Sequence, residues 1–162
     1  MKKFRLSHLT AAAVVAALYA VLTVSLGFMS YLPVQLRVAE ALTVLPFFSP
    51  YMIAGVSIGC LIANLFSPTV WWVDVLFGTM ATLIGAVGTW ALSKKNLRFL
   101  APLPPVLANT VIVGTMLTVL SGVPSSLWIN GLTVFLGEAV SCYGFGLPLL
   151  LLLEKYKKNI WK

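Results

Sequence analysis

The residues of this chain best suited to bind a ligand are charged and amide side chains that stand in or beside long apolar runs. They are Arg37, Glu40, Asn64, Asp74, Asn109, Asn130 and Glu138. A carboxylate or guanidinium at the centre of a bilayer costs about 2.5–3.5 kcal/mol on insertion scales, so such a group normally faces a cavity or a partner. Carboxylates accept paired hydrogen bonds, and amides both donate and accept them. The pattern therefore predicts a buried polar site.

The same chain lacks the groups that catalysis needs. His8 is its only histidine, and Cys60 and Cys142 lie within apolar runs, so serine, cysteine and zinc hydrolases have no base or ligand set here. The sequence contains no G-x-x-x-x-G-K-[ST] phosphate loop. We expect no enzymatic activity, no cofactor, no metal ion and no nucleic-acid partner. The two cysteines are expected to be buried thiols, and any use of ATP must come from a partner.

The composition predicts a membrane protein. Of the 162 residues, 60% are hydrophobic and 9% are charged, and the mean hydropathy is +0.99. Because a soluble domain has about a quarter charged residues, residues 1–162 are predicted to form a single integral membrane domain in the lipid bilayer. A transmembrane helix takes about 20 residues, so roughly six helices would leave room only for short loops and tails.

Basic residues set the expected topology. They cluster at Lys2, Lys3 and Arg5, at Lys94, Lys95 and Arg98, and at Lys155, Lys157, Lys158 and Lys162. Because basic clusters favour the cytoplasmic side, an even number of spans should separate each cluster from the next. Pro46 and Pro50 divide the uncharged stretch after Glu40 into two helices, which satisfies this rule. Both termini are therefore expected in the cytoplasm.

The expected fold class is an all-α membrane protein with six transmembrane helices. Their approximate ranges are residues 8–29, 34–48, 51–66, 71–93, 103–120 and 126–153. The first range is too long for the apolar core of a signal peptide, although its basic start and its alanines resemble one. The second is short and polar at its start, so neighbouring helices must bury its ends.

This topology brings the polar residues together on one side of the membrane. Those at the outer ends of their helices are Arg37, Glu40, Asn64, Asp74 and Asn130, and those lying deeper are Asn109 and Glu138. Structural roles compete with ligand binding. Arg37 and Glu40 form an i, i+3 pair, and Asp74 lies at a favourable helix N-terminus. An interhelical hydrogen bond is the corresponding alternative for Asn109 and Glu138.

Small residues form stripes that let helices pack closely. One face of the fourth helix carries Asp74, Gly78, Ala81, Gly85 and Gly88, and one face of the third carries Gly55, Gly59 and Ala63. On the first helix the stripe is Ala12, Ala16 and Ala20, with Ala13 and Ala17 in a second one. The residues alone favour internal packing for the first helix, which shows no buried polar group worth naming.

Two tryptophans lie close to the polar residues. Trp72 is next but one to Asp74, and Trp128 is next but one to Asn130. An interfacial aromatic belt is the first explanation for both. Stacking on a planar ligand is the alternative.

Several sequence motifs resemble a known family. They are QLRVAEALTVLPFF at 35–48, IGCLIANLF at 58–66, DVLFGTMATL at 74–83, APLPPVLANTVIVG at 101–114 and GE at 137–138. The chain resembles the QueT family, the predicted queuosine-precursor substrate-binding (S) components of energy-coupling factor (ECF) transporters. These segments cover most of the chain after residue 30, and the first helix matches loosely.

The resemblance implies a six-helix protein of the bacterial plasma membrane that captures a scarce micronutrient, here queuine or one of its precursors. Such an S-component docks on a shared transmembrane subunit that carries two ATPases, and an Ala-x-x-x-Ala surface on its first helix contacts that subunit. The surface maps onto Ala12, Ala16 and Ala20. Substrate is expected near the outer side, and transport would involve toppling of the whole S-component.

The implied ligand is a 7-deazaguanine base, whose ring N–H and amino donors a carboxylate can accept side by side. Glu138 is the first choice for that contact. Supporting polar contacts are expected from Asn109, Asn130, Asn64 and Arg37. Asp74 or Glu40 would supply a counter-charge for an aminomethyl group on the base. Trp72 or Trp128 would stack on the ring. An S-component for another vitamin, a non-transporting assembly subunit and a stand-alone carrier are the alternatives, the last disfavoured because no internal repeat is visible.

Overall fold

The computed structural model describes residues 6–27, 36–67 and 71–160, and every regular element among them is a helix. The separate helices are α1 (Leu6–Ser25), η1 (Val38–Phe47), α3 (Tyr51–Asn64) and α6 (Leu103–Ser121). Two further helices each join three pieces: α4 (Trp71–Val73), η2 (Asp74–Gly78) and α5 (Thr79–Ser93), then α7 (Leu127–Ala139), η5 (Val140–Gly146) and α8 (Leu147–Ile160). Short 3-10 turns η3 (Arg98–Leu100) and η4 (Pro124–Ser126) lie in the connections. The all-α prediction is confirmed.

The predicted helix ranges lie close to these, except that the last helix ends at Ile160, seven residues after the predicted end at 153. Residues 28–29 and 34–35 of the predicted ranges lie outside the described residues. Four stretches are long and apolar enough to cross a membrane, namely Leu6–Ser25, Asp74–Ser93, Arg98–Ser121 and Leu127–Tyr156. η1 and α3 are shorter, at about 20 Å each, against about 30 Å for the hydrocarbon core. The six helices are therefore present, and six complete crossings stay a prediction.

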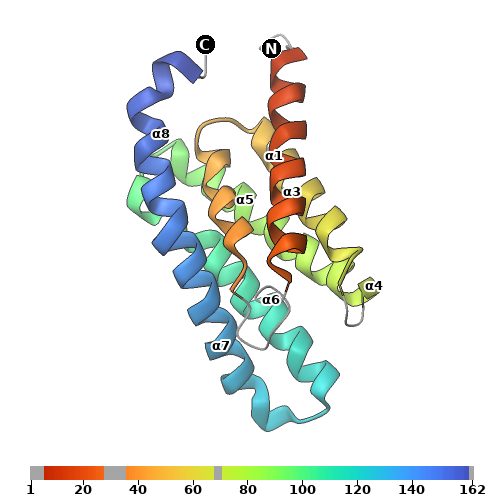
Figure 1. Ribbon diagram of the computed structural model, residues 1–162. Coiled ribbons are helices and arrows are strands. Elements are labelled where there is room, and N and C mark those ends of the chain that lie inside the picture. Colours follow the sequence, from red (N-terminus) through yellow and green to blue (C-terminus); the bar gives the residue numbers. More distant parts are fainter. Residues whose placement is uncertain (1–5, 28–35, 68–70, 161–162) are drawn as a thin grey trace.

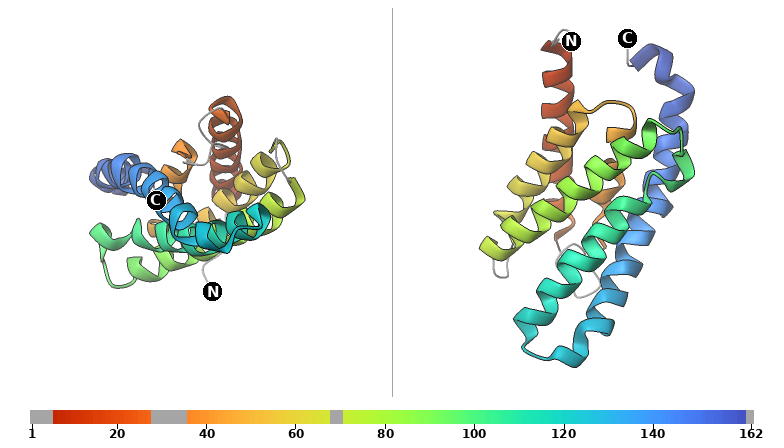
Figure 2. Two further views of the ribbon diagram at one scale, coloured as in Figure 1. Left: turned by 90° about the horizontal axis from the view of Figure 1, so that it is seen from below. Right: turned by 180° about the vertical axis from the view of Figure 1, so that it is seen from behind.

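Successive helices run back and forth along the bundle (Figure 1). The start of α1 and the end of α8 lie at the same end, as do the connections from η1 to α3 and from α5 to α6 (Figure 2, right). The turn between α6 and α7 lies at the opposite end. The connection that holds Lys94, Lys95 and Arg98 thus lies at the same end as the start of α1 and the end of α8, whereas Lys2, Lys3, Arg5 and Lys162 lie outside the described residues. The assignment of this end to the cytoplasm stays a prediction.

The outer surface of the bundle is apolar. Exposed side chains on α1 include Leu9, Val14 and Leu18, and those on α3 include Ile58 and Ile62. Water would penalise so much exposed hydrocarbon, whereas lipid tails would solvate it. Together with the four long apolar stretches, this surface identifies a multi-pass membrane protein.

Glycines allow two pairs of helices to pack with their backbones almost in contact. A Cβ atom added to Gly55 or Gly59 on α3 would lie 2.8 Å from the carbonyl oxygen of Ala12 or 2.7 Å from that of Ala16 on α1. On α5, a Cβ atom at Gly85 would lie 2.5 Å from the Cα atom of Pro105 on α6. The predicted small-residue stripes on the third and fourth helices are confirmed as packing faces.

η1 is a 3-10 helix buried in the middle of the bundle, where most of its residues are inaccessible. Its period of three places Glu40 and Thr43 on one face and Ala41 and Val44 on another. The second face packs on Gly146, where an added Cβ atom would lie 3.0 Å from a methyl carbon of Val44. The first face is left free to carry polar side chains into the interior.

The contact of α1 with α3 leads to a stability prediction. In Gly59→Ala the new methyl group meets the α1 backbone, which cannot move aside as a side chain can. We therefore expect the free energy of unfolding to fall by about 1–3 kcal/mol, the usual cost of overpacking. The measurement is the thermal unfolding midpoint of the purified protein in detergent.

Gly131→Ala on α7 is the matched control, because no atom lies within 4 Å of a Cβ atom there. Alanine is favoured over glycine inside a helix by about 1 kcal/mol, so this variant should melt no earlier than the parent. Equal melting of the two variants would show that α1 and α3 are not packed as described.

Candidate functional site

A carboxylate lies at the centre of the bundle. Glu40 is completely buried, and its Oε1 atom accepts a hydrogen bond from the hydroxyl group of Tyr19 on α1. The hydroxyl group of Thr82 on α5 lies 3.3 Å from the same oxygen, and also 3.2 Å from the sulfur of Cys60 on α3. The second oxygen, Oε2, has no hydrogen-bond partner among the described residues. Four helices therefore meet at Glu40, and half of its carboxylate is unused.

A second carboxylate approaches the first from α7. Glu138 is 2% exposed, and its Oε2 atom lies 3.7 Å from the sulfur of Cys142. One carboxylate oxygen of Glu40, one of Glu138 and the Cys142 sulfur all lie within 4.8 Å of one another. Thr43 on η1 also contacts Cys142, at 3.8 Å. We call Glu40 and Glu138 the acid pair.

Two rare π-helical segments lie next to acidic residues. η2 begins at Asp74, and η5 begins two residues after Glu138. The wider turn of η5 keeps Ser141, Cys142 and Gly146 buried together on the side that faces η1. Such local widening of a helix is frequent at functional sites.

Arg37 supplies positive charge to the acid pair. It immediately precedes η1, is 3% exposed and interacts electrostatically with both Glu40 and Glu138. Its Nη1 atom passes Gly78, at 3.8 Å from where a Cβ atom would stand. A Cβ atom at residue 78 would instead lie 2.8 Å from the amide nitrogen of Asn64, so the glycine makes room for the Asn64 side chain.

Asn64 and Asp74 join α3 to η2 at the edge of this cluster. The amide nitrogen of Asn64 donates to the backbone oxygen of Asp74 at 2.9 Å, and the Asp74 carboxylate accepts from Ser67. Asn64 is completely buried, and its Oδ1 atom has no hydrogen-bond partner among the described residues. Part of the role of both residues is thus structural, and one acceptor is left over.

Asn109 on α6 lies beside the Glu138 member of the acid pair. It is 1% exposed, and its side chain interacts with Glu138. Its amide nitrogen nevertheless forms no hydrogen bond that meets ordinary geometric criteria within the described structure. The predicted interhelical bond between these two residues is therefore incomplete, and a buried donor stays available.

The structure does not bring Asn130, Trp128 and Trp72 to this cluster. Asn130 donates to Thr118 and Ser126 at 3.1 Å each, near the turn between α6 and α7. It lies eight residues from Glu138, which is about 12 Å along a helix. Trp128 is 85% exposed.

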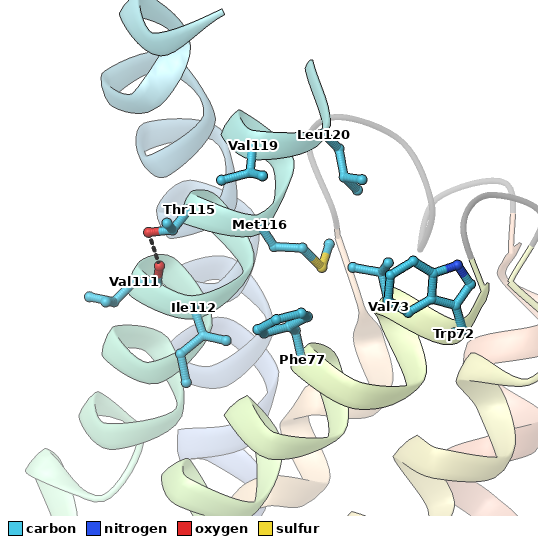
Figure 3. Close-up of a pocket in the computed structure, with 9 residues that line it drawn as sticks. All are labelled: Trp72, Val73, Phe77, Val111, Ile112, Thr115, Met116, Val119 and Leu120. Atoms are coloured by element: carbon cyan, nitrogen blue, oxygen red, sulfur yellow. Dashed lines mark hydrogen bonds between the residues drawn. The ribbon is translucent and has the colours of Figure 1, made fainter. Parts of the chain in front are cut away.

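Trp72 lines a separate groove between the α4 and η2 segment and α6 (Figure 3). The groove has a volume of about 440 Å³, and its walls are apolar side chains such as Phe77 and Met116. The one hydroxyl group among them, on Thr115, already bonds to the carbonyl oxygen of Val111. This surface offers little to a polar ligand and suits a lipid chain.

Tyr19 and Thr82 were missed by the sequence analysis, and the expectation that the first helix buries no polar group of note is wrong. The signal was present, because Tyr19 and Thr23 continue the spacing of Ala12 and Ala16 along one helix face. Both are buried, and the Thr23 hydroxyl bonds to the Tyr19 carbonyl oxygen at 2.9 Å. The expectation that Cys60 and Cys142 are buried thiols is confirmed.

Two of the three alanines in the predicted stripe of the first helix pack inside the bundle. Ala12 and Ala16 are 8% and 6% exposed and lie against Gly55 and Gly59, whereas Ala20 is half-buried. The parallel stripe, Ala13 and Ala17, is exposed. The exposed alanines of α1 are therefore those of the second stripe.

The cluster as a whole can recognise a small polar molecule. It combines carboxylate acceptors, a guanidinium and amide groups in an interior from which lipid and most water are excluded, where hydrogen bonds are strong. Glu40, Glu138 and Cys142 would also offer three atoms to a metal ion. The positive charge of Arg37 opposes a divalent cation at that position.

Comparison with known proteins agrees with this architecture. The model of a family described as QueT transporter matches residues 9–155. A curated protein of Lactococcus lactis subsp. cremoris, named Queuosine precursor transporter QueT, is 44% identical over 86 residues, which are 52% of this chain and 50% of that protein. The matched segment thus spans about half the length of this relative. No solved structure matches the chain significantly. Since the family model covers nearly all of the sequence, the chain belongs to the QueT transporter family.

Proposed function

We propose that this chain captures a queuosine precursor, a 7-deazaguanine base, for import across a bacterial plasma membrane. Its family supports a role in transport, and the name of its Lactococcus relative supports the class of substrate. The observation that carries the proposal is the enclosed acid pair, with unpartnered polar atoms on Glu40, Asn64 and Asn109 around it.

The base and the cluster have matching hydrogen-bonding groups. A 7-deazaguanine carries ring N–H and amino donors together with a ring carbonyl acceptor, and its donors need carboxylate or amide oxygens. Glu138 is the leading acceptor, and the free amide nitrogen of Asn109 beside it is the matching donor for the carbonyl. Arg37, Glu40, Asn64 and Asp74 complete the proposed site. Ligand contacts by Asn130, Trp72 and Trp128 are not required.

Substitution of Glu138 tests this site directly. In Glu138→Gln the shape is kept, but an amide N–H replaces an acceptor oxygen and would face the donors of the base. A lost charge-assisted hydrogen bond is worth about 1.5–3 kcal/mol, so affinity for the preferred deazaguanine should fall about tenfold to 150-fold in titration calorimetry.

Glu154→Gln is the control for this experiment. Glu154 is a partly exposed acid on α8 whose Oε2 atom lies 3.0 Å from Arg98, far along the helix from the acid pair. Its removal should leave ligand affinity unchanged. Wild-type affinity in Glu138→Gln would remove Glu138 from the site.

Transport requires energy that this chain does not supply by itself, so we propose that it works as the S-component of an ECF importer. It would dock on a shared transmembrane subunit with two ATPases, with its own termini in the cytoplasm. The exposed stripe of Ala13 and Ala17 on α1 is the proposed docking face, because small residues permit close helix contact. The initial assignment to Ala12, Ala16 and Ala20 moves by one residue for this reason.

A pair of neighbouring substitutions separates docking from folding. Ala17→Leu places bulk on the exposed stripe and should lower co-purification of the transmembrane subunit and ATPases severalfold, since overpacking costs about 1–3 kcal/mol. Its substrate affinity should stay at the parent level.

Ala16→Leu places the same bulk against Gly59 and should instead lower the unfolding midpoint of the isolated chain. If Ala17→Leu assembles as well as the parent, this face of α1 is not the docking surface.

Two other functions are distinguished by the same calorimetry. An S-component for another vitamin would bind riboflavin or thiamine and ignore the deazaguanines. An assembly subunit would bind none of these molecules, and Glu138→Gln would then alter complex formation. The polar atoms left unpartnered in the interior favour small-molecule binding over that second role.

A further inference from the structure

The buried charges of the bundle do not balance. Among the described residues one guanidinium, Arg37, is buried together with three carboxylates, Glu40, Asp74 and Glu138. The segments 28–35 and 68–70 contain no lysine, arginine or histidine, and Arg37 is the only basic residue between His8 and Lys94. The interior therefore has up to two negative charges in excess.

The imbalance is sharpest at the acid pair. One oxygen from each carboxylate lies within 4.8 Å of the other, and Arg37 is the one buried positive charge that acts on both. Two anions so close in a medium of low dielectric repel each other strongly, so a second positive charge stabilises them. The candidates are a proton, a metal ion and an organic cation.

The spacing of the acid pair suits an ammonium group. An ammonium nitrogen has N–H bonds at the tetrahedral angle, so two hydrogen bonds of about 2.8 Å bridge oxygens about 4.6 Å apart, which fits the 4.8 Å limit of the acid pair. Glu40 has a completely buried Oε2 atom with no donor among the described residues, and Asn109 places beside Glu138 an amide nitrogen that forms no hydrogen bond of ordinary geometry there. Asp74 is a weaker candidate, because its carboxylate already accepts from Ser67. Arg37 repels a divalent metal ion about twice as strongly as a singly charged ammonium group at the same distance.

We propose that the acid pair binds the alkylammonium group of a cationic 7-deazaguanine, so that the protein selects its substrate by charge. This inference rests on the proposed function and changes the orientation of the base within the site. Glu138 accepts from the ammonium group of a cationic base, in place of the ring N–H and amino edge. The ring carbonyl lies beside the 7-substituent of such a base, where the Asn109 amide nitrogen can donate to it. The N–H and amino edge then faces the other end of the cluster, where Asn64 has a buried acceptor without a partner.

The test compares three bases that differ only at the 7-position, by titration calorimetry on the purified full chain. They are 7-aminomethyl-7-deazaguanine, which carries a positive charge, and the neutral 7-hydroxymethyl and 7-cyano analogues. The hydroxymethyl compound has nearly the shape of the cation, so it isolates the effect of charge. We expect the cation to bind at least about tenfold more tightly than either neutral base.

Two variants locate the selectivity. Glu40→Gln keeps an oxygen for the Tyr19 hydroxyl but loses the charge, so the preference for the cation should shrink to about twofold or less. Asp74→Asn, which also removes a buried acid, should change the affinities for charged and neutral bases together and leave their ratio intact. If Glu40→Gln does not fold, the test rests on the unmodified protein, through the ratio of its affinities for the aminomethyl and hydroxymethyl bases.

Other results would overturn either the charge inference alone or the proposed function as well. Equal binding of the aminomethyl and hydroxymethyl bases, or selectivity that survives in Glu40→Gln, would overturn the charge inference and leave the proposed function standing. Competition by Na⁺ or Zn²⁺ alone would assign the acid pair to a metal ion and overturn it as well. Failure of all three bases to bind would overturn the proposed function, and this inference with it.

Discussion

The hydrogen bond from Tyr19 to Glu40 is the interaction on which the interior of this bundle depends. η1 is only about 20 Å long and lies buried among longer helices, so its position depends on what it contacts. Glu40 attaches it to α1 through Tyr19 and to α5 through Thr82. A charged group without such partners is costly to bury in a membrane interior, so it would face water or take the uncharged protonation state. The same residue thus places η1 and forms one half of the acid pair.

Close packing of the helices brings these polar groups together. α1 and α3 approach until backbone meets backbone at Gly55 and Gly59, which points Tyr19 at Glu40 rather than at lipid. Gly78 acts differently, because its missing side chain leaves room for the amide group of Asn64. A stripe of small residues therefore has two functions in this protein, and only the surroundings of each glycine decide between them.

The sequence was sufficient to predict the helices, because apolar length, proline positions and basic clusters each constrain where a helix can begin and end. It was also sufficient to single out Glu138 and Asn109 as deep polar residues. It could not reveal the 3-10 form of η1 or the π-helical form of η2 and η5, since those depend on packing that no local pattern encodes. Asn130 and Trp128 were grouped with the site because they lie at the outer end of their helix, but depth alone does not determine which way a residue faces. Tyr19 shows the converse, since its spacing from Ala12 and Ala16 places it on the buried face of the helix but does not indicate that its hydroxyl group meets a carboxylate.

The unpartnered atoms connect the stability of the bundle with its proposed activity. A buried donor or acceptor without a partner costs about 1–3 kcal/mol, and Glu40, Asn64 and Asn109 each contain such an atom. A sequence selected for stability alone would replace these residues with apolar ones of similar size, because a half-satisfied polar network is worse than an apolar core. Their presence in a membrane interior is explained if a ligand supplies the missing hydrogen bonds. The cost of leaving these atoms unpaired then becomes part of the affinity for the molecule that pairs with them, and a ligand lacking either the donors or the charge would leave that cost in place.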